Sequence, residues 1–194
     1  NKWGVKPMWV HIYRWLGFSY HKTGQFRKEK KVYKKAEREF PPSSYIIRQQ
    51  ASLSLTEGDT ITANQYIEKY ISLIKDDSPS EVEILYHLAS IYYEADKFDR
   101  AEKYCRQILS LKPGNPYRMN NLAMFLIDTD RNVNEGLELV AKALELIPDN
   151  YNFMVTKGWG FYKQGKYKEA LELLERADSL HFHVYDYSLN LHLE

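Results

Sequence analysis

Apolar residues recur along this chain at helical spacing, in paired blocks that are separated by short polar turns. The clearest pair lies between Leu85 and Pro113, where large apolar, small and aromatic residues precede a polar turn and apolar and small residues return after it. Spacings of three and four residues predict an amphipathic helix in each block. The turn between the blocks predicts that the two helices form a hairpin, so we expect an all-α chain.

The same pattern returns about every 34 residues, the period typical of hairpin repeats. Each of five copies places a small residue in its first block, at Gly17, Ala51, Ala89, Ala123 and Gly158. The turn residues of the five copies are Gly24, Gly58, Asp96, Asp130 and Gly165. We expect the small residues where the two helices of a hairpin approach closely, because a larger side chain there would overpack the contact.

These copies resemble the tetratricopeptide repeat, whose pattern is W-x2-L-G-x2-Y followed by A-x3-F, A and P. The first copy carries matching residues at Leu16, Gly17, Tyr20, Phe26, Tyr33, Ala36 and Pro41, and the resemblance covers roughly residues 10–184. It implies a right-handed superhelical solenoid of antiparallel helix pairs. With a last helix after the fifth copy, about 11 helices are expected.

The resemblance predicts a single array over residues 1–194. The expected repeats are 10–43, 44–81 including a spacer, 82–115, 116–150 and 151–184, with a capping helix at 185–194. The capping helix rests on the apolar spacing of Tyr185, Leu189 and Leu193. Neighbouring hairpins bury each other's apolar faces, so the array is expected to be stable only as a stack.

In tetratricopeptide arrays that resemble this chain, the first helix of each repeat lines a concave groove for a peptide. Side chains that packing leaves available on those helices are the candidate groove residues. Aromatic side chains among them give a large contact area with few rotors to freeze, and an asparagine amide can both donate to and accept from a peptide backbone. The predicted groove residues are Arg14, Arg48, Tyr86, Tyr93, Tyr117, Asn121, Trp159 and Tyr162. Because the chain has 16 tyrosines, packing remains the alternative role for each aromatic.

Charge excludes a general attraction to nucleic acid or membrane, because the formal net charge is only +1. The cationic run from Arg27 to Arg38 is interspersed with glutamate, so we interpret it as a solvated helix face and expect no nucleic-acid binding. No apolar run approaches the roughly 20 residues of a membrane span. The lysine, asparagine and arginine pattern with which related domains bind C-terminal carboxylates has no match, so we expect no binding of such chaperone tails.

Two local signals for metal or catalysis are weak. Asp128, Asp130, Asn132 and Asn134 follow the oxygen ligands of a calcium loop, but Val133 replaces the turn glycine and Leu139 replaces the bidentate glutamate. We interpret the segment as a turn, with Asn134 capping the following helix. The single cysteine, Cys105, is expected in the core. We therefore predict no metal, no cofactor and no catalytic site; the cysteine content favours the cytoplasm only slightly and leaves the compartment open.

The predicted function is a non-catalytic scaffold that binds a protein or peptide in the groove. The alternative is a structural spacer or self-association segment of a larger protein, because the chain begins at Asn1 and is expected to be a fragment. In that case an upstream repeat or a second copy of the chain would cover Trp3, Trp9 and Trp15.

Overall fold

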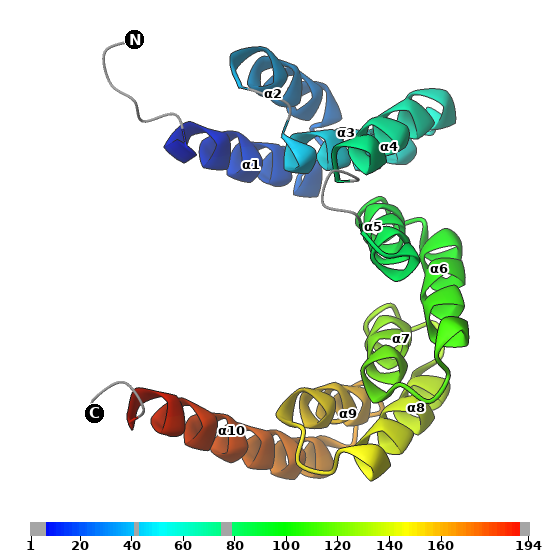
Figure 1. Ribbon diagram of the computed structural model, residues 1–194, viewed down its shortest axis with the longest axis vertical. Helices are drawn as coiled ribbons and strands as arrows, with labels where there is room; N and C mark the ends of the chain where they lie inside the picture. The colour runs from blue at the N-terminus through cyan, green and yellow to red at the C-terminus, as the bar shows by residue number, and fades with distance from the viewer. Residues whose placement is uncertain (1–6, 41–42, 75–78, 191–194) are drawn as a thin grey trace. The chain divides into compact units, whose positions relative to one another are not determined.

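The computed structural model describes residues 7–40, 43–74 and 79–190, and the side chains of residues 12–40, 43–74 and 79–180. Within these residues the secondary structure is entirely α-helical, which confirms the expected fold class (Figure 1). The helices are α1 (Pro7–Lys22), α2 (Phe26–Glu39), α3 (Ser44–Thr56), α4 (Thr60–Ile74), α5 (Glu81–Glu94), α6 (Phe98–Leu111), α7 (Pro116–Asp128), α8 (Val133–Leu146), α9 (Tyr151–Lys163) and α10 (Tyr167–Asn190).

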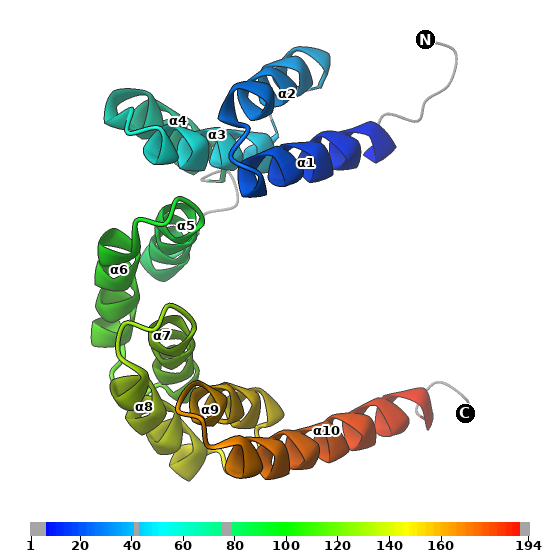
Figure 2. The same cartoon turned by 180° about the vertical axis from the view of Figure 1, so that it is seen from behind.

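The chain forms two compact units, Asn1–Ala101 and Glu102–Glu194. In the first unit α1 packs on α2 and α3 on α4, and α3 also contacts α2 and α5. In the second, α7 packs on α8 and α9 on α10, and α9 also contacts α7 and α8. Both views of the ribbon show these successive hairpins side by side within each unit (Figure 2). Stacked helical hairpins thus provide the core of each unit.

One backbone conformation closes all five hairpins. Gly24, Gly58, Asp96, Asp130 and Gly165 have φ values of 67°, 81°, 56°, 54° and 74°. In the second hairpin, for example, the Gly58 amide donates to the Leu55 carbonyl and the Asp59 amide to the Ser54 carbonyl. This is the hydrogen-bond pattern that ends helices with a left-handed residue. Glycine adopts it without strain, and aspartate tolerates it better than most residues.

The small-residue positions lie at close contacts between helices. A side chain at Gly17 in α1 would collide with the ring of Tyr33 in α2, which is fully buried. Ala51, Ala89 and Ala123 are also buried. Gly136 in α8 lies so close to α7 that an added Cβ would be 2.6 Å from Ile127 Cγ1 and 3.0 Å from the Ala123 carbonyl oxygen. Small residues therefore set the approach of the paired helices.

Two details differ from the sequence expectation. Asn132, not Asn134, caps α8, because the Asn132 side chain accepts from the Glu135 amide; the turn is shorter than the calcium-loop interpretation assumes. A separate helix after residue 184 is also not observed among the described residues. Instead, α10 continues unbroken to Asn190. Its sequence has no turn residue there, so the helix simply extends; residues 191–194, with Leu193, lie outside the described part.

The individual repeat boundaries remain a prediction. Trp3 lies outside the described residues, as does the side chain of Trp9, whereas Trp15 is largely exposed on α1. Across the described residues, no helix has both the length and the apolar character needed to cross a membrane.

Candidate protein-binding surfaces

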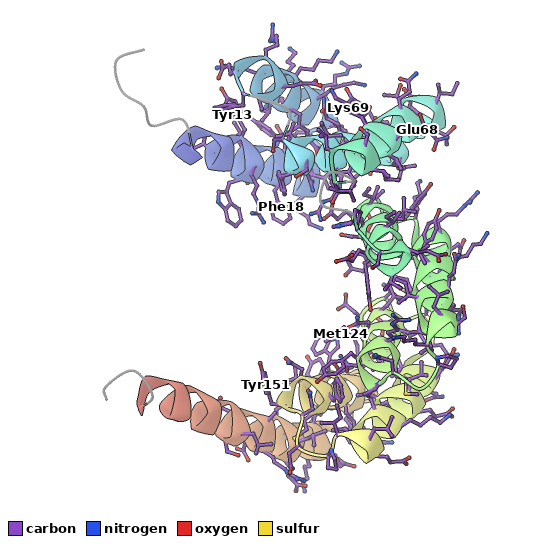
Figure 3. All side chains as sticks on the ribbon, in the orientation of Figure 1. Tyr13, Phe18, Glu68, Lys69, Met124 and Tyr151 are labelled. Atoms are coloured by element: carbon purple, nitrogen blue, oxygen red, sulfur yellow. The ribbon has the colours of Figure 1, made fainter. Side chains whose placement is uncertain are left out.

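The first unit contains a pocket of about 310 Å³. Side chains from α1, α3, the end of α5 and the start of α6 line it, with the turn before α6. Five are aromatic, and the lining set is Arg14, Trp15, Phe18, His21, Lys22, Tyr45, Arg48, Gln49, Ser52, Tyr93, Glu94, Asp96 and Phe98. Phe18 projects from the side of α1 that faces away from α2, whereas Tyr13 lies between the two helices (Figure 3). The pocket therefore lies on the first-helix side of the hairpins.

Arg48 and Glu94 form an ion pair at the wall of this pocket. Arg48 Nη2 donates to Glu94 Oε1 at 2.8 Å, and Gln49 Nε2 donates to Glu94 Oε2 at 2.9 Å. Both carboxylate oxygens are thus bonded to α3. The pair fixes the end of α5 against α3, and it balances the charge of Arg48 inside the unit.

Arg14 is held differently. Its guanidinium carbon lies 4.7 Å from the centre of the Tyr45 ring and 5.6 Å from that of Trp15. Such cation–π contacts contribute about 0.5–1 kcal/mol at exposed sites. No carboxylate pairs with Arg14 among the side chains that the structure describes. Arg14 therefore brings an unbalanced positive charge to the pocket.

His21 belongs to a buried pair at the same surface. Its Nδ1 lies 3.0 Å from Oε2 of Glu29, which is fully buried in α2. The hydrogen bond with Glu29 raises the pKa of His21, the Glu94 backbone carbonyl adds to the rise, and burial opposes it. The equivalent position in the second helix of the other hairpins is Ala63, Ala101, Gly136 or Ala170. The pair with His21 explains how a carboxylate can occupy this helix contact in the first hairpin.

Two polar groups of the pocket wall lack a hydrogen-bond partner in the structure. They are the Ser52 hydroxyl and Nε of Arg48. Ser52 is only 2% exposed. Its neighbours on α3, Arg48 and Gln49, are bonded to Glu94 through Nη2 and Nε2, so the Ser52 hydroxyl and the Arg48 Nε remain available on this helix face.

The second unit presents a different, more apolar surface on α7 and α9. Tyr117 packs edge-on against Phe153 with ring centres 5.4 Å apart. Trp159 stacks on Tyr162 at 5.1 Å with an angle of 8° between the rings, and Lys163 lies 5.4 Å from the Trp159 ring centre. Tyr117 and Tyr162 are each at least half exposed. Two pairs of packed aromatic rings thus lie on α7 and α9.

The predicted groove residues divide between these two surfaces. Arg14, Arg48 and Tyr93 meet in the pocket, while Tyr86 is half-buried on α5 and does not line it. In the second unit Tyr117, Asn121 and Tyr162 are exposed and Trp159 is half-buried. Their role in binding stays a prediction. The sequence pattern did not single out Ser52 or Tyr45, and it gave no sign that Glu94 pairs with Arg48.

The described residues contain no cluster of three or more histidine, cysteine, aspartate or glutamate side chains that could hold a metal. Cys105 is only partly buried in α6, not in the core as the sequence predicts, and this burial raises the pKa of its thiol to about 11. A thiol with so high a pKa is a poor nucleophile at neutral pH.

Stacked hairpins with small residues at the helix contacts and a left-handed residue in each turn define a helical repeat protein. Residues 82–115 match the sequence model of the tetratricopeptide repeat. This segment is the third repeat expected from the sequence pattern.

Named relatives are similar over part of the chain. A "TPR repeat-containing protein PA4667" of Pseudomonas aeruginosa is 28% identical over 128 residues, which are 64% of this chain and 22% of that protein. The human "RANBP2-like and GRIP domain-containing protein 2" is 31% identical over 85 residues, 43% of this chain and 5% of that protein. The chain thus spans less than a quarter of either relative. The solved structure "MamA 41-end from Desulfovibrio magneticus RS-1" aligns over 89% of this chain and 95% of its own, with 17% identity and a TM-score of 0.48.

Proposed function

We propose that this chain is a non-catalytic module that binds an extended polypeptide segment on the first-helix side of its hairpins. Repeat folds of this type generally serve as protein-interaction scaffolds. The observation that carries the proposal is the pocket of the first unit, where α1, α3, α5 and the start of α6 bring five aromatic rings and two arginines onto one surface. Rigid aromatic rings and arginines are the residues that dominate binding hot spots.

A display selection tests this proposal. Random decapeptides are presented inside a longer carrier chain and selected on the purified protein, and the affinity of the best peptides is measured by fluorescence polarisation. We expect specific peptides with dissociation constants in the micromolar range, and Tyr93→Ala should weaken them about tenfold or more because truncating a hot-spot aromatic costs about 2 kcal/mol.

Trp159→Ala tests in the same way whether the aromatic surface of the second unit binds the peptide. Circular dichroism and urea unfolding verify that both variants fold. A selection that returns no specific peptide would contradict the proposed function. If Trp159→Ala abolishes binding while Tyr93→Ala does not, the aromatic surface of the second unit, and not the pocket, is the binding site.

A further inference from the structure

The hydrogen-bonding state of the pocket in the first unit indicates which chemical group it binds. Its one half-buried carboxylate, Glu94, already accepts one hydrogen bond from Arg48 and one from Gln49. The remaining carboxylate, Asp96, is exposed in the turn before α6. Both oxygens of the inner carboxylate are therefore already bonded within the unit.

The groups that remain include two guanidinium donors. Arg14 packs over Tyr45 and Trp15 and pairs with no carboxylate in the described part of the chain. Nε of Arg48 is buried and has no partner. A guanidinium can only donate, whereas a hydroxyl can donate or accept. The third group, the Ser52 hydroxyl, is more than nine-tenths buried, lines the pocket and also has no partner.

Charge points the same way. The ion pair with Glu94 balances Arg48, and the contact with Glu29 engages the His21 ring. Lys22 lies 5.7 Å from the Phe18 ring centre at the same surface. Arg14 and Lys22 thus leave the pocket with a surplus of positive charge over Asp96. A surplus of both donors and positive charge complements an anionic acceptor.

We propose that the pocket binds the side-chain carboxylate of an aspartate or glutamate within an extended partner peptide. Arg14 pairs with the carboxylate, and acceptor oxygens of the same segment satisfy Ser52 and Nε of Arg48. The aromatic walls, Trp15, Phe18 and Tyr93 among them, pack on the apolar residues beside the acid. This inference rests on the proposed function and specifies its ligand.

The pocket suits the carboxylate of an acidic side chain within a peptide better than a C-terminal carboxylate. Trp15, Phe18 and Lys22 along α1 are all exposed, so a peptide can enter and leave the pocket along that helix. Presenting the decapeptides inside a carrier chain, with neither end free, therefore selects for the proposed ligand and excludes a terminal carboxylate.

The test uses the peptides from the selection described above. We expect them to share an aspartate or glutamate at one aligned position. Replacing that acid by its amide should weaken binding to the native protein about tenfold or more, as for loss of a charge-assisted hydrogen bond. On Arg14→Gln the acid and amide peptides should bind within about twofold of each other. Ser52→Ala should weaken the acid peptide without abolishing its preference over the amide.

Arg38→Gln is the charge-matched control, because Arg38 is exposed on α2 and does not line the pocket. That variant should retain the full preference for the acid.

The other possible results distinguish failure of this inference from failure of the proposed function. Peptides that bind specifically but share no acid, or an acid and amide that bind the native protein equally, would overturn this inference and leave the proposed function standing. If a phosphoserine peptide binds tenfold tighter while the carboxylate is no better than the amide, the occupant is a phosphate and the proposal is wrong. Only a selection with no specific peptide removes both.

Discussion

At the scale of single residues, polar groups in unusual places carry the most information. Glu29 is fully buried, yet it lies at a position that is small in most copies of the repeat. A buried charge is tolerated only when it is paired, and His21 supplies the partner eight residues earlier in the sequence. The sequence alone shows the irregular glutamate, but the pairing depends on how α1 and α2 face each other.

His21 provides a prediction of pH dependence. Its pKa is raised above the ordinary value of 6.5, so its stabilising contribution is complete below pH 6.5 and is lost as the pH rises through the pKa of the folded state. His21→Gln should therefore reduce the free energy of unfolding by about 1–3 kcal/mol at pH 5.5 and by clearly less at pH 8.5, as measured by urea unfolding. Glu29, Lys22 and the Glu94 carbonyl are the charged or polar groups that face this ring.

His87 is the control for the sign of this effect. Burial lowers the pKa of His87 below its ordinary value of 6.5. As the pH falls below 6.5, the free energy of unfolding of the native protein should therefore decrease relative to that of His87→Gln. If both variants show the same pH dependence, the assignment of the His21–Glu29 pair is wrong.

At the scale of helices and turns, the sequence pattern predicts where each hairpin turns, because the conformation of a turn residue depends mainly on that residue and its close neighbours. The five turn residues expected from the repeat are the five non-helical residues with positive φ among the described residues. The start of α8 is harder to predict, because Asn132 and Asn134 are both suitable caps. The end of α10 is also harder to predict, because its helical pattern is not interrupted by a turn residue. In both cases tertiary packing decides the boundary.

The contacts between hairpins were the least predictable part of the candidate site. Arg14 and Arg48 were expected on one surface, and they do meet in the pocket. The Arg48–Glu94 pair, however, joins residues 46 positions apart in α3 and α5. Such a pair depends on the stacking angle of successive hairpins, which helical periodicity does not encode.

The turn geometry gives a second prediction. Gly58 has a φ of 81° and nothing within 4 Å of an added Cβ, so Gly58→Ala tests backbone strain without a steric clash. We expect the free energy of unfolding to fall by about 1 kcal/mol, measured by urea denaturation.

Gly114→Ala is the matched control. Gly114 also has open space around an added Cβ but does not have a positive φ. Its replacement should leave stability unchanged or raise it slightly, because alanine restricts the unfolded chain. An equal loss in both variants would show that the strain explanation is incorrect.

At the scale of the whole molecule, buried apolar contacts should outweigh the many ion pairs. In the second unit Arg106 pairs with Glu102 and with Glu135, while Glu102 also pairs with Arg131. Arg106 keeps 44% of its side chain exposed, and exposed ion pairs usually contribute no more than about 1 kcal/mol. By contrast, Leu126 is fully buried in α7.

We therefore predict that Leu126→Ala lowers the free energy of unfolding by about 2–5 kcal/mol, and that Arg106→Gln lowers it by at most about 1 kcal/mol. Urea unfolding in low and high sodium chloride checks both values, since salt should remove most of the Arg106 effect and little of the Leu126 effect. An Arg106 effect larger than that of Leu126 would contradict this order.

The partly buried thiol of Cys105 has a practical consequence. With a pKa of about 11, only about one molecule in ten thousand carries a reactive thiolate at pH 7. A cysteine engineered at the exposed rim position Lys22 would then react with a maleimide dye long before the native one. A fluorescent label that reports ligand binding can thus be attached beside the pocket without first replacing Cys105.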